Sequence, residues 1–117
     1  MKVTKTYFMV MAADVTRASR FYKKALALTA AFESPEWTEL RSDGATVALH
    51  KGGGPGERDT GLGFSVDDIA AACASVTAAG GKVVSPPEQR PGEGITLATV
   101  ADTEGNRFFL SEEKGRS

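Results

Sequence analysis

The stretch VADTEGNRFFLSEE, from Val100 to Glu113, combines a turn signal with an apolar strand pattern. Side chains on a strand alternate between its two faces. Phe108 and Leu110 are therefore expected on one face and Phe109 on the other. If Phe108 and Leu110 form part of the core, Phe109 must meet something else, and the nature of that contact bears on function.

The same pattern occurs twice along the chain. GATVAL (44–49) matches GNRFFL (105–110) with an offset of 61 positions. Asp14 and Asp68 are 54 positions apart, and each stands at the N-cap of a predicted helix. Each half thus predicts a strand, a helix and three strands. One such unit cannot cover both faces of its sheet, so two units are expected to pair.

The 117 residues are expected to form a single domain, with modules 1–50 and 61–113. The linker 51–60, KGGGPGERDT, has the Gly, Pro and charged composition of a flexible connector. In the first module the pattern predicts a helix at 15–28 and strands at 3–11, 29–33, 37–41 and 46–50. In the second it predicts a helix at 69–79, strands at 61–66, 82–85, 95–101 and 107–111, and a three-proline loop after residue 85.

The alternation assigns one face of each sheet to the helix of its own module. The residues expected on this helix-facing side are Leu40, Val47, Leu49, Phe108 and Leu110. The opposite face carries Ala48, His50 and Phe109. Either the two sheets curve around a shared cavity, or these residues fill a second core.

Composition and charge exclude few functions but set expectations. Apolar residues make up 41% and charged residues 25%, as in an ordinary globular protein. A net charge of −1 gives no reason to expect nucleic acid or a membrane surface as partner. The single cysteine, Cys73, excludes an internal disulfide. No apolar run approaches the roughly 18 residues of a spanning helix, and no leader pattern is evident, so a cytoplasmic location is expected.

Several short motifs in a fixed order resemble those of a known superfamily. They are Asp14-Val15, Arg17-Ala18, Phe21-Tyr22, Leu26-x-Leu28, FSVDDI (64–69), AAGGKVV (78–84) and DTEGNRFFL (102–110). Together they resemble the vicinal oxygen chelate superfamily, which includes glyoxalase I, bleomycin-resistance proteins and extradiol dioxygenases. The resemblance implies an α+β fold in which two βαβββ modules pair to form a cleft-bearing sheet, often completed in a homodimer.

Metal-dependent members of that superfamily carry four ligands, His or Glu, on the first and last strands of each module. Carried over to this chain, the positions fall on Tyr7, Ala48, Gly61 and Phe109. Ala, Gly and Phe side chains cannot ligate a divalent ion, and a catalytic metal needs about three protein ligands. We therefore expect no metal at these positions and no other cofactor.

The hairpin register places a different group of side chains on the cleft face. If Asp43-Gly44 forms a two-residue turn, Glu39 lies opposite Ala48 and Trp37 opposite His50. His50 beside a carboxylate could act in acid–base chemistry, or it could be a partly exposed residue at the end of an edge strand. Trp37 could stack on a planar ligand, or it could fill a core or dimer interface.

The leading hypothesis is a metal-free protein that binds a small aromatic or amphipathic molecule, similar to the bleomycin-resistance members that sequester a drug. The candidate ligand-binding residues are Tyr7, Met9, Trp37, Glu39, His50 and Phe109. One alternative is a lyase, isomerase or dioxygenase of the same superfamily, with Glu39 and His50 as base or metal ligands. The other is a structural or regulatory dimer with a filled cleft. A homodimer is the expected assembly.

Overall fold

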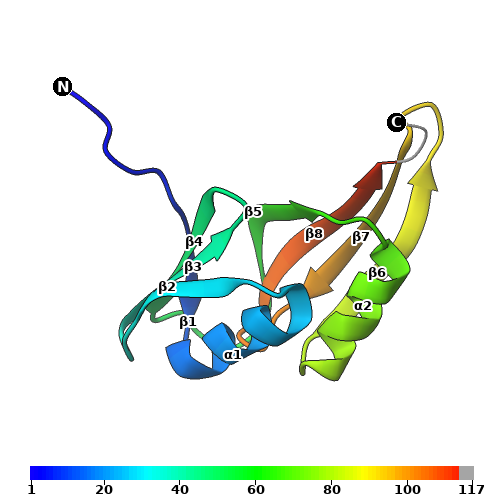
Figure 1. Ribbon diagram of the computed structural model, residues 1–117. Helices are drawn as coiled ribbons and strands as arrows, with labels where there is room; N and C mark the ends of the chain where they lie inside the picture. Colours follow the sequence, from blue (N-terminus) through cyan, green and yellow to red (C-terminus); the bar gives the residue numbers. More distant parts are fainter. Residues whose placement is uncertain (114–117) are drawn as a thin grey trace.

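Two copies of one motif, a strand, a helix and three strands, follow each other along the chain (Figure 1). The structure is a computed structural model and describes residues 1–113. The first module consists of β1 (Phe8–Ala12), α1 (Val15–Leu26), β2 (Thr29–Glu33), β3 (Trp37–Ser42) and β4 (Ala45–Lys51). The second consists of β5 (Arg58–Ser65), α2 (Ile69–Ala78), β6 (Lys82–Arg90), β7 (Ile95–Ala101) and β8 (Asn106–Glu113). The predicted α+β fold of two βαβββ modules is confirmed.

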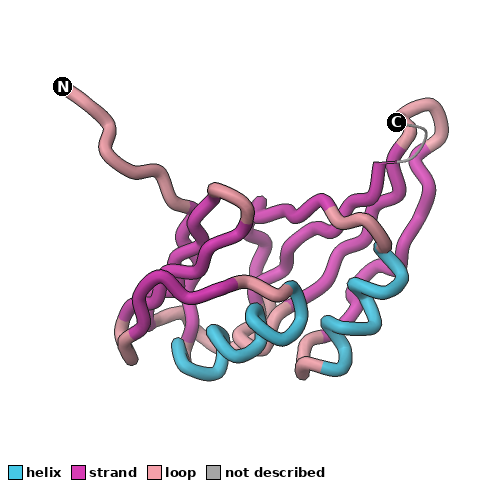
Figure 2. Tube along the Cα trace, in the orientation of Figure 1, coloured by secondary structure: helices cyan, strands magenta, loops and turns pink. Residues whose placement is uncertain are grey.

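Each module forms a mixed four-stranded sheet with the same topology. The strand orders are β1-β4-β3-β2 and β5-β8-β7-β6, and the first strand of each module runs parallel to the last. Figures 1 and 2 show the two helices next to each other on one side of the sheets, and α1 and α2 pack against each other. The modules therefore share one hydrophobic core, formed between the sheets and the helices.

Both helices begin where the sequence predicts, because a carboxylate caps each start. Asp14 and Asp68 accept a hydrogen bond from the backbone N–H three residues later, at 3.0 Å in each case. A second carboxylate accepts a hydrogen bond from the backbone at each helix start. Glu104 accepts from the Asp14 N–H at 3.0 Å, and Glu112 from the Ile69 N–H at 2.8 Å. Neither helix within residues 1–113 is long and apolar enough to cross a membrane.

The β3–β4 hairpin has the predicted turn and register. Asp43-Gly44 adopts positive φ angles of 42° and 84°, as a two-residue hairpin turn of this kind requires. Trp37 lies opposite His50, and Glu39 lies opposite Ala48. Because a slip of one residue would exchange the two faces of the sheet, this turn decides which side chains leave the core.

The core separates the two phenylalanines of β8. Phe108 and Leu110 are fully buried, whereas Phe109 is 40% exposed on the opposite face. The Phe108 ring packs against the aromatic rings of Phe21, Tyr22 and Phe64, with centroids 5.6–6.3 Å apart. The predicted helix-facing residues Leu40, Val47 and Leu49 are likewise buried. Phe109 therefore lies outside the core that residues 1–113 form.

The first strand is shorter than predicted. The strand predicted at 3–11 begins only at Phe8, and residues 1–7 are exposed; Figure 1 shows this segment leading away from the sheets. The register pairs Phe8 with Val47, and β4 starts at Ala45. Because the chain turns back there, β4 offers no partner to residues 3–5.

Two boundaries in the second module also differ from the prediction. β5 already begins at Arg58, inside the linker predicted at 51–60. The predicted proline loop after residue 85 is part of β6, which contains Pro86 and Pro87 and pairs with β7 through two register shifts. Because β6 is an edge strand, proline can occupy it without the loss of a hydrogen bond on its outer side.

Candidate functional site

An aromatic cluster lies on the face of the first sheet that points away from α1. The cluster consists of Tyr7, Trp37 and His50. The Tyr7 and Trp37 rings meet edge to face with centroids 5.6 Å apart, and the Trp37 and His50 rings do the same at 5.9 Å. Tyr7 remains 49% exposed and Met9, two residues along the chain, 48% exposed. We refer to this surface as the open face of the first sheet.

Glu39 is hydrogen-bonded next to the aromatic cluster. Its carboxylate accepts from the Trp37 indole N–H at 2.9 Å and from the Lys5 ammonium at 2.8 and 3.0 Å. The hydrogen bond from Lys5, followed by that from Trp37, holds the pKa of Glu39 below its ordinary value. Glu39 is therefore an anion at neutral pH, and the lowered pKa makes it a weaker base. The contacts of the Glu39 carboxylate are thus with Lys5 and Trp37, and the His50 ring meets that of Trp37.

The six predicted binding residues divide between the two sheets. Met9 pairs with Ala48 in the first sheet, beside the aromatic cluster. Phe109 lies in the second sheet, opposite Gly63 on β5 and Thr99 on β7. Ala48 is fully buried although it is on the open face, so the neighbouring side chains already cover the floor of the first sheet.

The four positions that correspond to metal ligands in the superfamily do not form a donor set. Ala48 and Phe109 offer no donor atom, and Gly61 lies at an irregularity of β5 where φ is +80°. Tyr7 supplies only a phenol. Within residues 1–113, no group of three or more His, Cys, Asp or Glu side chains is placed to hold a metal ion. The residues present at these positions do not fit the metal that the superfamily commonly uses.

The side chains that sequence reasoning missed on the open face are Lys5, Phe32 and Arg41. Phe32 pairs with Glu39 across β2 and β3 and is 55% exposed. Arg41 follows Glu39 by two residues on β3 and so shares its face. The hairpin register could have found Arg41. The bulge between Ala30 and Phe32 concealed Phe32. Lys5 was missed because residues 1–7 form no strand in the structure, so no strand pairing could place it beside Glu39.

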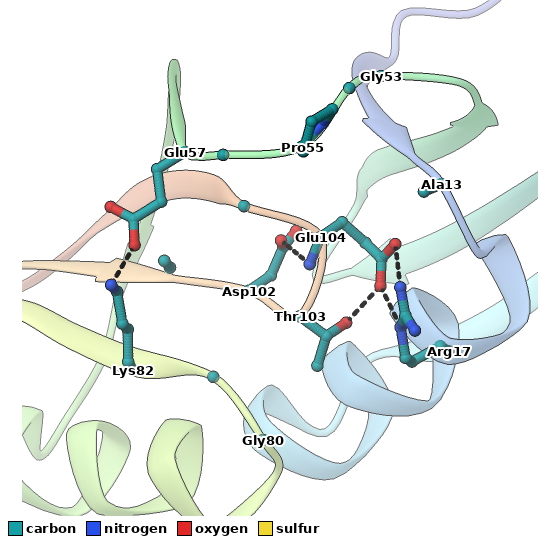
Figure 3. Close-up of a pocket in the computed structure, with 15 residues that line it drawn as sticks. Ala13, Arg17, Gly53, Pro55, Glu57, Gly80, Lys82, Asp102, Thr103 and Glu104 are labelled. Carbon is teal, nitrogen blue, oxygen red and sulfur yellow. Dashed lines mark hydrogen bonds and ion pairs between the residues drawn. The ribbon is translucent and has the colours of Figure 1, made fainter.

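A separate cavity of about 580 Å³ lies where the linker meets the β7–β8 turn (Figure 3). Its wall is formed by the glycine-rich segments 53–57 and 80–82 and by the turn 102–105, with Arg17 at one side. Gly105 has φ +88°, and a Cβ there would clash with the Gly56 carbonyl oxygen. The abundance of glycine in the segments 53–57 and 80–82 was the available sequence signal for this hollow.

Four of the charged side chains around this cavity form two ion pairs (Figure 3). Arg17 Nε donates to Glu104 at 2.7 Å, and Lys82 forms an ion pair with Glu57. Burial raises the pKa of Glu104, but the hydrogen bond from Arg17 and two weaker ones outweigh burial, so the pKa lies below its ordinary value. This arrangement favours a structural junction between the modules over a site for a charged ligand.

The Glu104 contact makes a pH-dependent contribution to stability. Because its pKa is lower in the folded chain than the unfolded value of about 4.3, the contribution is present above that value and is lost as the pH falls through the folded pKa. We expect Glu104→Gln to lower the free energy of unfolding by about 1–2 kcal/mol near pH 7, given the exposure of Arg17, and by much less at a pH below the folded pKa of Glu104. Urea unfolding of both proteins across this range is the measurement. An equal loss at both ends of the range would contradict it.

A smaller hollow of about 440 Å³ bridges the neighbouring edges of the two sheets. It is lined by the start of β4, by residues 61–65 of β5 and by Phe8. A Cβ at Gly61 would contact the Phe8 ring at 4.0 Å. This hollow is therefore mainly apolar, and small residues keep it open.

Comparison with known proteins agrees with this architecture. Residues 6–110 match the model of the Glyoxalase/Bleomycin resistance protein/Dioxygenase superfamily. The chain belongs to this superfamily. The match covers both βαβββ modules, and the predicted resemblance to this group is thereby confirmed at the level of the superfamily. Among curated proteins, none matches the chain.

Solved structures with low sequence identity to this chain have the same fold. A glyoxalase/bleomycin resistance protein/dioxygenase family enzyme from Burkholderia phytofirmans is 18% identical, with TM-score 0.76 over 92% of this chain and 96% of its own. A glyoxalase/bleomycin resistance protein from Albidiferax ferrireducens is 22% identical, with TM-score 0.73 over 95% and 99%. TioX from Micromonospora sp. is 19% identical, with TM-score 0.70 over 92% and 98%. At these identities the likeness concerns the fold.

Proposed function

We propose that this superfamily member binds a small aromatic or amphipathic molecule on the open face of the first sheet, without a metal ion. The observation that carries the proposal is the exposed aromatic cluster of Tyr7, Trp37 and His50 next to Met9. Aromatic rings give a planar ligand a large contact area, and methionine adapts to varied apolar shapes. Sequestration of a drug-like compound is one role that such a site would serve.

The donor chemistry supports a metal-free site. Ala48, Gly61 and Phe109 stand where the superfamily places metal ligands, and none of them has a side-chain donor. Glu39 is engaged by Lys5 and Trp37, which leaves it neither a ligand of a neighbouring ion nor a strong base. These contacts favour binding over the lyase, isomerase or dioxygenase alternative.

A second copy of the chain is the proposed partner of the open face of the first sheet and of the face of the second sheet that carries Phe109. Large apolar side chains on them remain exposed, namely Tyr7, Met9, Phe32 and Phe109. Exposed apolar surface of this kind commonly marks an interface or a binding groove. In a homodimer, the Phe109 face of one copy would form a wall of the cleft whose floor is the aromatic cluster of the other.

Because Trp37 is the only tryptophan, its fluorescence tests the proposed function. A panel of neutral and charged aromatic compounds is expected to contain members that quench or shift the emission saturably, with Tyr7→Ala weakening the response at least several-fold because one ring of the cluster is lost. Prior treatment with a chelator is expected to leave binding unchanged. An emission that no member of the panel alters, or a response that requires added metal, would contradict the proposal.

A further inference from the structure

Lys5 holds the position that a positively charged ligand would take. Its ammonium contacts both oxygens of Glu39, at 2.8 and 3.0 Å, although the two residues are 34 positions apart. Lys5 belongs to the segment 1–7, which is exposed and forms no strand. The Lys5 side chain is itself 47% exposed. The contact is therefore made by a residue that no strand pairing holds in place.

The surroundings of the Glu39 carboxylate have the chemistry of a cation site. The Trp37 indole N–H donates to it at 2.9 Å and so holds the carboxylate beside the ring. The Glu39 side chain is only 17% exposed, in contrast to that of Lys5. A fixed carboxylate attracts an ammonium through charge-assisted hydrogen bonds, and the faces of neighbouring aromatic rings attract it further.

Phe32 and Arg41 complete this part of the open face. Phe32 pairs with Glu39 and leaves a largely exposed ring next to the carboxylate, which an aromatic ligand would contact. Arg41 lies on the same face as Glu39, and its positive charge also lowers the pKa of that carboxylate. A bound cation must therefore displace Lys5 and must tolerate the charge of Arg41, which limits the expected preference to a modest factor.

We propose that the open face of the first sheet selects aromatic amines, and that the ligand's ammonium replaces that of Lys5 on Glu39 while its ring packs against Trp37, Tyr7 and Phe32. The inference rests on the proposed function and adds to it the charge of the ligand. All the groups involved belong to the first module, so the preference requires no residue from a second copy. Release of Lys5 would accompany binding.

Three probes with the same ring system but different charges separate the contribution of the charge to binding from that of the ring. They are the 2-naphthylmethylammonium ion, 2-naphthylmethanol and 2-naphthoate. The readout is the single indole N–H signal of Trp37 in a nitrogen-15 correlation spectrum, because this group donates to Glu39 and senses what the carboxylate binds. We expect the ammonium to bind at least about threefold more tightly than the alcohol, and the alcohol more tightly than the carboxylate.

Three substitutions are expected to change the affinity for the ammonium probe in directions that a purely structural role of these residues would not produce. Glu39→Gln is expected to remove the preference for the ammonium over the alcohol. Lys5→Ala removes the internal competitor and Arg41→Ala removes a repulsive charge, so each is expected to tighten binding of the ammonium about two- to threefold and to leave the alcohol unchanged. Lys2→Ala, in the same segment as Lys5, is the matched control and is expected to have no effect.

The outcomes separate this inference from the proposed function. If the alcohol binds as tightly as the ammonium, the selection of amines is wrong and the aromatic site stands. If 2-naphthoate binds most tightly and Lys5→Ala weakens it, the open face selects anions and the inference is overturned. If none of the probes nor the wider aromatic panel moves the Trp37 signal, both proposals fail. Because Lys5 and Arg41 are exposed, their variants test the idea even where Glu39→Gln perturbs folding.

Discussion

Phe108→Ala is expected to lower the free energy of unfolding by about 3–5 kcal/mol, which is a large share of the stability of a chain of this size. The Phe108 side chain is fully buried, and its ring packs against rings from α1 and β5. Truncation removes apolar contact area and leaves a cavity between the two modules, because the surrounding rings cannot all collapse into it. Urea unfolding followed by far-ultraviolet circular dichroism measures the loss.

The next residue provides the matched control. Phe109 is the same side chain on the same strand, but it is 40% exposed on the other face. Phe109→Ala is expected to change the free energy of unfolding of the monomer by less than about 1 kcal/mol. Similar losses for the two variants would mean that the two faces of β8 are equally buried in solution, which would contradict the assignment of the core to the helix-facing side.

Asp102→Ala is expected to cost about 3–5 kcal/mol in the free energy of unfolding. This carboxylate is 5% exposed and accepts from the Tyr22 hydroxyl at 2.5 Å and from the Asn106 side chain at 2.9 Å. It also accepts the backbone N–H groups of Glu104 and Asn106, at 2.7 and 2.9 Å. Replacement by alanine leaves several buried donors without a partner, and the tie between α1 and the β7–β8 turn is lost.

Asp68→Ala serves as the comparison for this substitution. Asp68 is also an aspartate that accepts a backbone N–H, but it is an exposed N-cap with one such contact. Its loss is expected to cost about 1 kcal/mol. If Asp102→Ala costs no more than Asp68→Ala in the same unfolding experiment, the buried network does not contribute as the structure indicates.

Much of the fold could be predicted because it depends on local signals. The Asp43-Gly44 turn requires positive φ at both positions, which determines the register and places Trp37 opposite His50. The carboxylates of Asp14 and Asp68 mark the helix starts through contacts three residues away. Strand ends were harder to predict, because residues 3–5 have strand-like sequence but find no neighbouring strand.

The candidate site could be predicted only in part. Trp37 and His50 lie together as the alternation and the hairpin register imply. Phe109, by contrast, belongs to the second sheet, and no local pattern relates its position to that of Trp37. The contact of Glu39 with Lys5 was not predicted, because Lys5 lies in a segment without regular structure. The site was therefore predictable within a hairpin and not between distant segments.

The amino-acid order alone determined the internal duplication, the helix caps, the hairpin register and the division of each sheet into a buried and an open face. Each of these features depends on neighbours within a few residues or on the period of a strand. Only the tertiary structure decided that the Lys5 ammonium forms an ion pair with Glu39, that Glu104 and Asp102 join the modules, and that glycine-rich segments line a cavity. These contacts connect residues up to 90 positions apart. The contacts of Glu104 and Asp102 form because α1 and α2 pack together over a common core, whose shape no local pattern encodes.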